Sequence, residues 1–351
     1  MKILVTGAAG FIGSGVAKSM LDAGYEVVGL DNINDYYDVN LKYGRLAELG
    51  IERDAIKPNE MTRSATYSRF RFIKASLEDS DFISRLFAEE QFGTVVNLAA
   101  QAGVRYSIEN PACYIQSNLI GFFNILEGCR HNKVKHLIFA SSSSVYGLNG
   151  KVPYSESDGI AHPVSLYAAT KKSNELMAHA YSKLYSIPVT GLRFFTVYGP
   201  WGRPDMSPFL FMDAILRDRP IKVFNNGEMW RDFTYIDDVV KEVTALVNHI
   251  PQPNSGWDAQ RADPSTSSAP YRIYNVGNQH ITKLTDYIEC IEKAIGRKAR
   301  KEYLPMQPGD VLRTWADSSA IAATTGIMPG TKLQDGIDRT VAWFRKFYKM
   351  Q

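Results

Sequence analysis

The sequence contains few cysteines and no long hydrophobic run. Its three cysteines among 351 residues, Cys113, Cys129 and Cys290, are odd in number and widely spaced, which is typical of free thiols in a reducing compartment and not of a disulfide framework. No stretch offers the roughly 20 apolar residues of a membrane-spanning helix, and the run after Met1 ends at Thr6, far short of a signal peptide. We therefore expect a cytoplasmic protein that does not contact a membrane.

An excess of one charge is also missing. Lysine and arginine number 40 and aspartate and glutamate 37, and the resulting net charge of +3 argues against nucleic acid as a partner. The six histidines and the cysteines form no cluster with metal-ligand spacing, so we expect no metal. The composition is otherwise that of an ordinary globular protein, with 45% hydrophobic residues, and the length favours two domains.

The first part of the chain alternates short aliphatic runs with longer amphipathic stretches, as repeated strand-helix units do. The strand candidates are residues 2–5, 26–30, 70–73, 94–98 and 136–139, and the helix candidates are residues 13–23, 79–90, 113–131 and 168–184. This alternation predicts an α/β fold built on a Rossmann-type, doubly wound parallel sheet.

Beyond residue 190, frequent prolines interrupt the periodicity and predict a smaller α/β domain. Its elements are strands at 221–224 and 271–276 and a closing helix at 332–348. We expect a cofactor-binding domain over residues 1–190, with returning segments near 231–250 and 271–278, and a mainly substrate-binding domain over residues 191–351. The polar stretches 50–68 and 251–270 are predicted to be surface excursions.

Three glycines follow the first strand at equal spacing. Gly7, Gly10 and Gly13 stand three residues apart, and Phe11 and Ile12 lie where the next helix begins. Such glycines permit a tight turn, let backbone N–H groups approach a pyrophosphate and let the helix pack closely on the strand. A glycine triplet alone is a weak signal, but its place between a strand and a helix predicts a dinucleotide site.

Asp31 stands eighteen residues after Gly13, at the end of the second strand. This is close to the offset of about 20 residues at which an acid binds the adenosine ribose. Because a carboxylate repels a 2′-phosphate, Asp31 predicts NAD as the cofactor, and not NADP, with Asn32 as a neighbouring contact. The alternative is a cap or turn role for Asp31.

Tyr167 is the only one of the nineteen tyrosines with a lysine, Lys171, four residues later. On a helix this spacing places both side chains on one face, where the ammonium stabilises a phenolate and lowers the tyrosine pKa from about 10. Such a tyrosine can act as a general base near neutral pH. A surface helix pair is the alternative.

Four serines follow the strand at 136–139, and they are Ser141, Ser142, Ser143 and Ser144. They would lie at the carboxyl end of a parallel strand, where ligands bind in such sheets. A turn that caps the next helix is the alternative.

Together these motifs resemble the extended short-chain dehydrogenase/reductase family. Within it the chain is similar to nucleotide-sugar 4-epimerases, above all to UDP-glucuronate 4-epimerases. The similarity spans nearly the whole chain, is weakest at 50–68 and 251–270, and rests on the phrases DNINDYYD from Asp31, AAQAGVRYS from Ala99, LYAATKK from Leu166 and RDFTYIDD from Arg231.

The resemblance implies a reaction in which C4 of a UDP-sugar gives a hydride to NAD and receives it back on the opposite face. Tyr167 would take the 4-hydroxyl proton, Lys171 would hold the nicotinamide ribose and tune Tyr167, and Ser142 would bind the 4-oxygen. The other residues with implied contacts are Asn118 and Phe195 near the cofactor, Ser143 and Ser144 in the sugar pocket, Arg231 at the diphosphate and Asp310 at the nucleotide ribose.

The sugar implied by the resemblance is UDP-glucuronate, converted to UDP-galacturonate for polysaccharide biosynthesis. Related dehydratases carry acids at the positions of Ser143 and Ser144, and uronate decarboxylases carry a glutamate at the position of Ser144. Since this chain has serines there, the 4-keto sugar is expected only to rotate in the site and then be reduced. Thr196 and Arg203 suit a carboxylate better than a hydroxymethyl group. For Arg203 the alternative is a diphosphate contact or a surface ion pair.

Three alternatives within the enzyme class stay open, namely a 4-epimerase of UDP-N-acetylhexosamine, of UDP-N-acetylhexosaminuronate or of UDP-glucose. A dinucleotide-sensing protein without turnover is the alternative of a different class. The resemblance also implies a homodimer through the helices at 113–131 and 168–184, although their apolar stripes would equally suit a core.

Overall fold

The computed structural model describes residues 1–307 and 309–350. In it the backbone forms two compact units, each assembled from three segments of the chain. The first unit consists of residues 1–149, 156–193 and 240–274. The second consists of residues 150–155, 194–239 and the chain from residue 275 onward.

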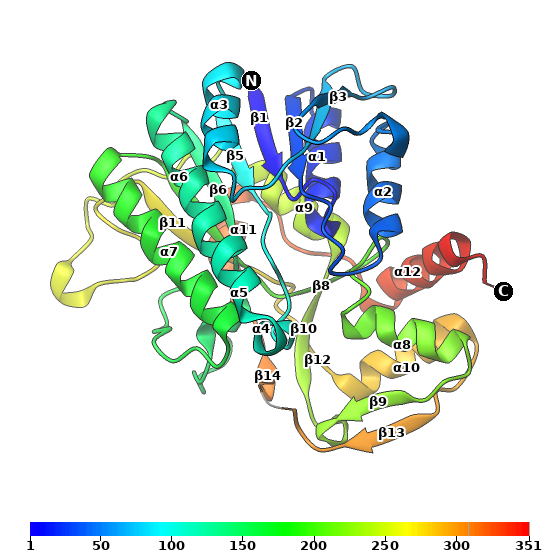
Figure 1. Ribbon diagram of the computed structural model, residues 1–351. Helices are drawn as coiled ribbons and strands as arrows, with labels where there is room; N and C mark the ends of the chain where they lie inside the picture. Colours follow the sequence, from blue (N-terminus) through cyan, green and yellow to red (C-terminus); the bar gives the residue numbers. More distant parts are fainter. Residues whose placement is uncertain (308, 351) are drawn as a thin grey trace. The chain divides into compact units, whose positions relative to one another are not determined.

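The largest sheet has eight strands in the order β11-β7-β6-β5-β1-β2-β4-β3 (Figure 1). Its strands are β1 (Lys2–Thr6), β2 (Glu26–Asp31), β3 (Met61–Arg63), β4 (Phe70–Lys74), β5 (Thr94–Asn97), β6 (His136–Ser142), β7 (Val189–Phe194) and β11 (Tyr271–Val276). β1 pairs in parallel with β2 and β5, β2 with β4 and β5 with β6, whereas the edge strand β3 runs antiparallel to β4. Because the chain order reverses beside β1, the sheet is doubly wound, which confirms the predicted Rossmann-type α/β fold.

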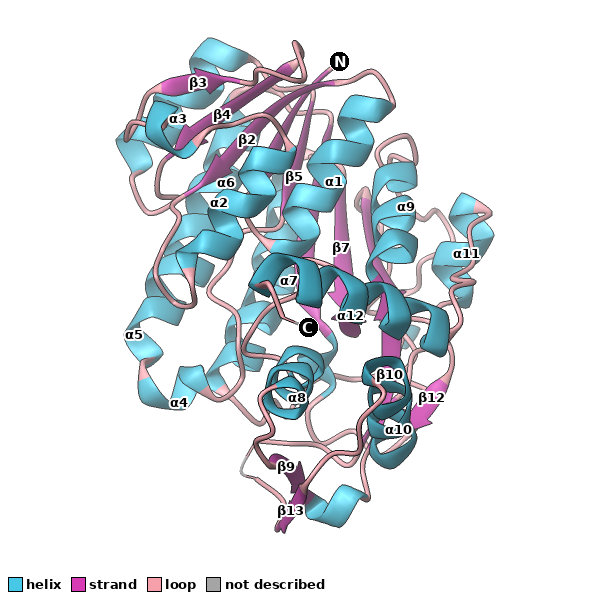
Figure 2. Cartoon of the chain, turned by 90° about the vertical axis from the view of Figure 1, so that its right-hand side faces the viewer, coloured by secondary structure: helices cyan, strands magenta, loops and turns pink. Residues whose placement is uncertain are grey.

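Helices cover both faces of this sheet, α1 and α2 on one side and α3, α6 and α7 on the other (Figures 1 and 2). They are α1 (Phe11–Asp22), α2 (Val39–Glu48), α3 (Ser80–Glu90), α6 (Gly121–His131) and α7 (Leu166–Tyr185). Strands covered on both faces have aliphatic centres, as in the sequence KILVT of β1, because neither face meets water there. Side chains such as Phe87, Phe122 and Phe139 fill the core beneath α3 and α6.

Capping residues set the starts of α3 and α7. The Asp79 carboxylate accepts a hydrogen bond from the backbone N–H of Phe82 at 3.0 Å, and the Ser165 hydroxyl accepts one from that of Ala168 at 3.1 Å. Each satisfies a backbone donor that the helix itself leaves unpaired. α7 therefore begins two residues before the predicted position.

The single helix predicted over 113–131 is divided in the structure. A short α4 (Tyr106–Glu109) precedes α5 (Pro111–Tyr114), a π-helical segment follows over Ile115–Ile120, and only then does α6 begin. A π-helical turn contains more residues than an α-helical turn, and such turns are frequent at functional sites. Here the turn contains the buried Asn118, whose contacts are described with the site.

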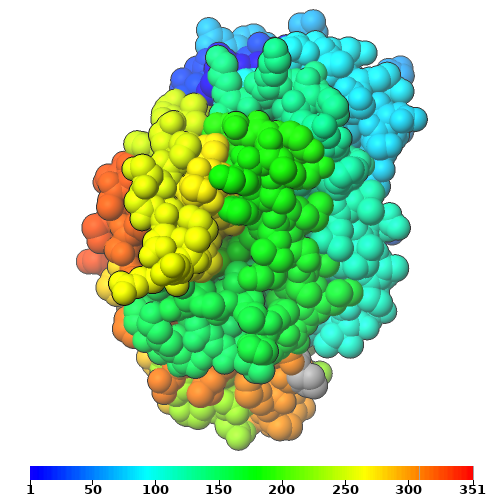
Figure 3. Space-filling view, turned by 90° about the vertical axis from the view of Figure 1, so that its left-hand side faces the viewer, coloured from blue at the N-terminus to red at the C-terminus, as the bar shows by residue number. Residues whose placement is uncertain are grey.

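Both polar stretches contain short pieces of regular structure. Residues 50–68 include a 3-10 turn, η1 (Arg53–Ala55), and strand β3, while residues 251–270 include η5 (Ala259–Arg261). The second stretch, yellow in Figure 3, lies against the green α7. There His179 Nε2 lies 2.8 Å from the Ser267 hydroxyl.

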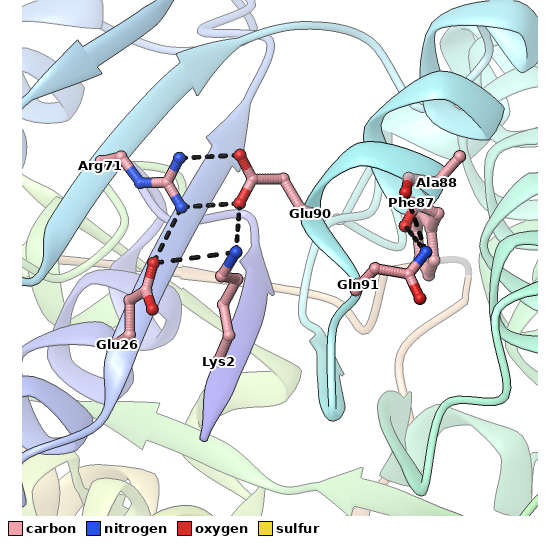
Figure 4. Close-up of polar contacts among 7 residues, drawn as sticks. All are labelled: Lys2, Glu26, Arg71, Phe87, Ala88, Glu90 and Gln91. Carbon is pink, nitrogen blue, oxygen red and sulfur yellow. Dashed lines mark hydrogen bonds and ion pairs between the residues drawn. The ribbon is translucent and has the colours of Figure 1, made fainter.

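An ion-pair cluster joins the amino ends of neighbouring strands in the first unit (Figure 4). Arg71 donates to both oxygens of Glu90, at the end of α3, and at 2.9 Å to Glu26 at the start of β2. Lys2, at the start of β1, donates to Glu90 at 2.8 Å. The cluster lies at the opposite ends of these strands from the predicted site, so its role is to tie strands and helix together.

In its described residues, the second unit is built from small sheets and helices. Its strands are β8 (Thr196–Tyr198), β10 (Trp230–Tyr235), β12 (Ile281–Lys283) and β14 (Arg313–Thr314), with the separate pair β9 (Ile221–Phe224) and β13 (Lys301–Leu304). Its helices are α8 (Ser207–Leu216), α10 (Leu284–Ile295), α11 (Ser319–Thr325) and α12 (Leu333–Tyr348). It also contains the 3-10 turn η4 (Asn225–Gly227) and the last two residues of β11. α9 (Ile236–Leu246) contains the boundary between the units at residues 239 and 240.

Aromatic rings form much of the core of the second unit. Phe233 on β10 stacks on Tyr287 of α10 with ring centroids 4.0 Å apart, and Trp201 lies 5.2 Å from Trp343 of α12. Large rings bury much apolar area per residue, which suits a unit with short strands. Among the helices of residues 1–307 and 309–350, none is long and apolar enough to span a membrane.

Candidate active site

The loop between β1 and α1 leaves no room for side chains. Gly7 has a φ of +70°, which favours glycine, and its carbonyl accepts the Gly10 N–H at 2.8 Å. A Cβ placed on Gly13 would lie 2.0 Å from the Gly7 carbonyl oxygen. Gly10 caps α1 without a side-chain hydrogen bond, so the first N–H groups of the helix, starting at Phe11, are left for a ligand. A cradle of this shape at a helix N-terminus suits a pyrophosphate.

Asp31 ends β2 directly beside this loop. One of its carboxylate oxygens accepts the Ala9 N–H at 3.1 Å, and the other accepts the Ile33 N–H at 2.8 Å. Asn32 follows, and its side-chain oxygen accepts the N–H of Asn34 at 3.1 Å in a tight turn. The carboxylate therefore has a fixed orientation at the carboxyl end of β2. By accepting the Ile33 N–H, Asp31 also has the turn role that was the alternative from the sequence.

Two buried cations near Asp31 were not predicted from the sequence. Arg45 on α2 donates to the Ala9 carbonyl at 3.0 Å and to the Tyr37 hydroxyl at 2.8 Å, and Lys42 donates to Asn34 at 2.8 Å. Burial lowers the pKa of Lys42. The residues belong to an amphipathic helix, where basic side chains usually face water, so only the packing of α2 reveals them.

Lys171 lies on the face of α7 that meets β6. Its side chain is buried, with 3% of its surface exposed, and its Nζ donates to the carbonyl of Ala140 at 2.9 Å. Burial lowers the pKa of the Lys171 ammonium to about 8, because a charged amine loses its hydration there. Tyr167 is half-buried one turn earlier, with its ring centroid 6.1 Å from that of Tyr114.

Ser142 is the last residue of β6 and is almost fully buried. Its hydroxyl lies 3.2 Å from that of Ser144 and accepts the Ser144 N–H at 3.2 Å, which caps the short helical turn η3 (Ser143–Tyr146). Both Ser143 and Ser144 are half-buried. The serines therefore lie at the carboxyl end of β6, as predicted, and one of them also fulfils the alternative capping role.

Asn118 connects three segments of the first unit. Its side chain accepts the Gln101 N–H at 2.8 Å and donates to the Gln101 carbonyl at 3.0 Å and to Thr170 at 3.1 Å, while its own carbonyl accepts Asn174 at 2.7 Å. Thr170 and Asn174 flank Lys171 on α7. The structure thus brings Asn118, Lys171 and the end of β6 together around one helix face.

The remaining predicted residues belong to the second unit. Phe195 is buried and hydrogen-bonds through its N–H to Val276 at 3.0 Å, and the half-buried Thr196 begins β8. Arg203, in the loop after β8, forms a two-point ion pair with Asp205 through its Nε and Nη2 atoms. Asp205 had not been predicted as its partner, and the ion-pair alternative for Arg203 is therefore realised.

Arg231 on β10 and the segment that contains Asp310 lie side by side. The Arg231 guanidinium donates to the carbonyl of Leu312 at 3.3 Å, and the Asp310 N–H donates to the Gln307 carbonyl at 3.3 Å. The neighbouring Asp232 accepts the N–H groups of Asn278, Gln279 and Ala316, and burial raises its pKa to about 6. Sequence reasoning missed this carboxylate, which anchors the strand beneath Arg231.

In the described part of the chain, no three His, Cys, Asp or Glu side chains gather in a way that could hold a metal ion. The polar groups of the first unit are instead a glycine cradle, a fixed carboxylate, a tyrosine, a buried ammonium and hydroxyls. These groups can bind a dinucleotide and move a proton at a hydroxyl.

Comparison with known proteins places the chain in a family. Residues 3–277 match the model of the NAD dependent epimerase/dehydratase family. The chain is 52% identical to Protein CapI of Staphylococcus aureus, over 99% of this chain and all of that one. It is 45% identical to a probable UDP-glucuronate 4-epimerase of Rhizobium meliloti, over 99% of this chain and 98% of the relative.

A solved structure is similar over the same length. It is the UDP-glucuronic acid 4-epimerase of Bacillus cereus in complex with UDP-glucuronic acid and NAD, with a TM-score of 0.84 and 33% sequence identity. The match covers 99% of this chain and 100% of that chain.

The burial of Lys171 predicts a specific pH dependence of stability. The folded pKa is about 8 against an ordinary value of 10.5, so between these pH values only the unfolded chain holds the proton. Because the unfolded state then binds more protons, the free energy of unfolding rises with pH in that window, by about 3 kcal/mol at 1.36 kcal/mol per pKa unit.

Urea unfolding of NAD-free protein between pH 7 and 10.5 measures this contribution as the difference between wild type and Lys171→Met. The variant lacks the Lys171 amine, and the contributions of the other titrating groups cancel in the difference between the two proteins. A difference that stays constant across the window would show that the buried ammonium keeps an ordinary pKa.

Proposed function

Because this chain belongs to the NAD dependent epimerase/dehydratase family, we propose that it is an NAD-dependent UDP-sugar 4-epimerase that interconverts UDP-glucuronate and UDP-galacturonate. The observation that carries this proposal is the buried Lys171, which stands one turn after Tyr167 on α7 and donates to the Ala140 carbonyl, two residues before Ser142. The Rhizobium relative and the Bacillus structure support the choice of sugar.

The first unit has the features of an NAD site. Gly7, Gly10 and Gly13 admit a pyrophosphate where a Cβ would collide with the backbone, and the N–H groups of Phe11 and Ile12 begin the helix that faces it. NAD held there would supply the acceptor for the C4 hydride and the donor that returns it.

The remaining cofactor contacts are assigned to residues around this cradle. Asp31 and Asn32 would bind the adenosine ribose, where a carboxylate disfavours NADP. Two further residues would lie near the nicotinamide. They are Asn118, which is hydrogen-bonded to α7, and Phe195, at the start of the segment 194–239 of the second unit.

Proton transfer at the sugar is assigned to the α7 face and the serines. Tyr167 takes the proton from the 4-hydroxyl group and returns it after the keto sugar has turned over. Lys171 makes the phenolate less costly through its positive charge, and Ser142 holds the 4-oxygen by a hydrogen bond. Ser143 and Ser144 line the pocket without adding an acid that would drive elimination or decarboxylation.

The second unit supplies the groups for the rest of the UDP-sugar. Thr196 and Arg203 would bind the glucuronate carboxylate, and Asp205 sets the orientation of the guanidinium. An arginine has five N–H donors, more than one carboxylate uses, so its pair with Asp205 is compatible with a second acid. Arg231 would meet the diphosphate and Asp310 the nucleotide ribose.

We also propose a homodimer formed through α6 and α7. Large apolar side chains are exposed on these helices, including Phe123 at 43%, Leu176 at 59% and Leu184 at 70%. Exposed apolar side chains that gather on neighbouring helices often mark a protein contact. The chain itself is proposed to work in the cytoplasm, since its three cysteines are free thiols.

Replacing the proposed base tests the reaction. We expect the wild-type protein to convert UDP-glucuronate to UDP-galacturonate without added reductant, and Tyr167→Phe to lower kcat by about 10² or more while NAD stays bound. Both proteins are assayed with UDP-glucuronate, UDP-glucose and UDP-N-acetylglucosamine, and chromatography of the products measures the rate of conversion of each sugar. Conversion by the variant at the wild-type rate would overturn the mechanism, and a preference for a neutral sugar would overturn the substrate.

Arg203→Ala tests the carboxylate contact. Charge-assisted hydrogen bonds contribute about 1.5–3 kcal/mol, so kcat/KM for UDP-glucuronate should fall roughly 10- to 150-fold, and that for UDP-glucose much less. A carboxylate that can rotate also favours loss of carbon dioxide, so some UDP-pentose is expected.

Arg217→Ala is the matched control for this variant, because it removes an exposed pair with Asp213 and should leave both substrates unaffected. Equal losses on both sugars in Arg203→Ala would assign this arginine to the diphosphate instead.

Sedimentation velocity tests the dimer. The protein should sediment as a dimer at micromolar concentration, and Leu176→Glu with Leu184→Glu should produce monomers, because two charges per chain enter an apolar interface. Met328→Glu, an equally exposed position in the second unit, is the control and should stay dimeric. A wild-type monomer would refute the interface.

A further inference from the structure

A fully buried ion pair lies behind the serines at the end of β6. Glu175 on α7 binds Arg193 on β7 at two points, with Oε1 to Nε and Oε2 to Nη2 distances of 2.9 Å each. The exposed side-chain fractions are 5% for Glu175 and 0% for Arg193. Neither residue takes part in the mechanism described above.

The glutamate of this pair anchors the end of β6. The Ser141 hydroxyl donates to Glu175 Oε1 at 2.6 Å. Because successive side chains of a strand point to opposite faces, Ser141 is held from one side while Ser142 faces the other. Lys171, one turn before Glu175 on the same face of α7, holds the preceding carbonyl of Ala140.

The arginine anchors the turn that follows. Arg193 Nη1 donates to the Tyr146 hydroxyl at 3.0 Å and to the Glu156 carbonyl at 3.3 Å, and the guanidinium lies 4.9 Å from the Tyr146 ring centroid. Tyr146 is the last residue of η3, which begins at Ser143. One ion pair therefore holds both ends of the segment 141–146.

Stability alone does not account for two charges in this place. Removing ions from water is costly, and an apolar pair of the same volume is often as stabilising as a buried ion pair. A two-point arginine–carboxylate pair differs from an apolar contact in its directionality, because it fixes distance and angle at both partners. The pair therefore fixes the position and the angle of the segment 141–146 that it holds.

We propose that Glu175 and Arg193 are positioning residues that set the place of the Ser142 hydroxyl for proton transfer at the sugar 4-oxygen. The inference rests on the proposed function, since it assigns a role within the same site. Displacement of a reacting group by about 1 Å costs on the order of 10² in rate, so loss of the pair should be visible in kcat.

The test is a double-mutant cycle of Glu175→Gln with Ser142→Ala. Gln keeps the shape of Glu but removes the charge, and we expect kcat for UDP-glucuronate to fall roughly 10- to 100-fold with KM changed less than about threefold. In the Ser142→Ala background the same substitution should lower kcat by less than about threefold, because the hydroxyl that it positions is already absent.

Glu90→Gln is the matched control, because it weakens the ion-pair cluster at the amino ends of the strands (Figure 4). It should lower Tm without lowering kcat measured well below Tm. Glu175→Leu combined with Arg193→Met should recover the Tm that Glu175→Gln loses, but not its kcat. If Glu175→Gln does not fold, Ser141→Ala replaces it in the cycle, since it removes only the link between the pair and β6.

The outcomes separate the two proposals. A wild-type protein that converts no UDP-sugar refutes the proposed function, whatever the variants do. Conversion by wild type with additive losses in Glu175→Gln and Ser142→Ala, or recovery of kcat by the apolar pair, overturns the positioning role alone.

Discussion

The contact between α7 and the carboxyl end of β6 is the constraint on which the rest of the site depends. A helix lying along a buried strand presents one residue to it per turn, and here these residues are Lys171 and Glu175. Both bind β6 within two successive residues, one through a backbone carbonyl and the other through a serine hydroxyl. Tyr167, one turn earlier on the same face, therefore has its position relative to Ser142 set by the helix.

The two buried cations of this region differ in how they are compensated. Arg193 has a carboxylate at two points, which keeps it charged and raises its pKa further above the ordinary value. Among the described residues, the hydrogen-bond acceptor of Lys171 is a carbonyl oxygen, and burial lowers its pKa to about 8. A fully compensated charge fixes the geometry of its partners, whereas a poorly compensated one can stabilise a phenolate, which is the role that we propose for Lys171.

The polar side chains of the second unit are positioned differently, because its strands are short and loops hold these side chains. Asp232 collects three backbone N–H groups from segments after β11 and β14, and Arg231 next to it contacts the carbonyl of Leu312. The loop with Arg203 starts from Trp201, whose ring packs against α12. The substrate contacts that we propose for this unit would therefore depend on the packing beneath the loops.

Much of the fold and of the first unit's site could be read from local patterns. The alternation of strands and helices, the glycines at spacing three, Asp31 and the Tyr167–Lys171 spacing are each encoded within a few turns of chain, where periodicity and backbone sterics act directly. Local patterns did not reveal the π-helical turn, the pairing of Glu175 with Arg193 or the burial of Lys42 and Arg45. Each depends on which segments pack together, and a charged residue carries the same letter whether it faces water or a buried partner. The sequence by itself determined where the glycine loop and the tyrosine that we propose as the base stand along the chain. Only the tertiary structure decided which charges are buried and compensated, because burial arises from contacts between residues far apart in the sequence.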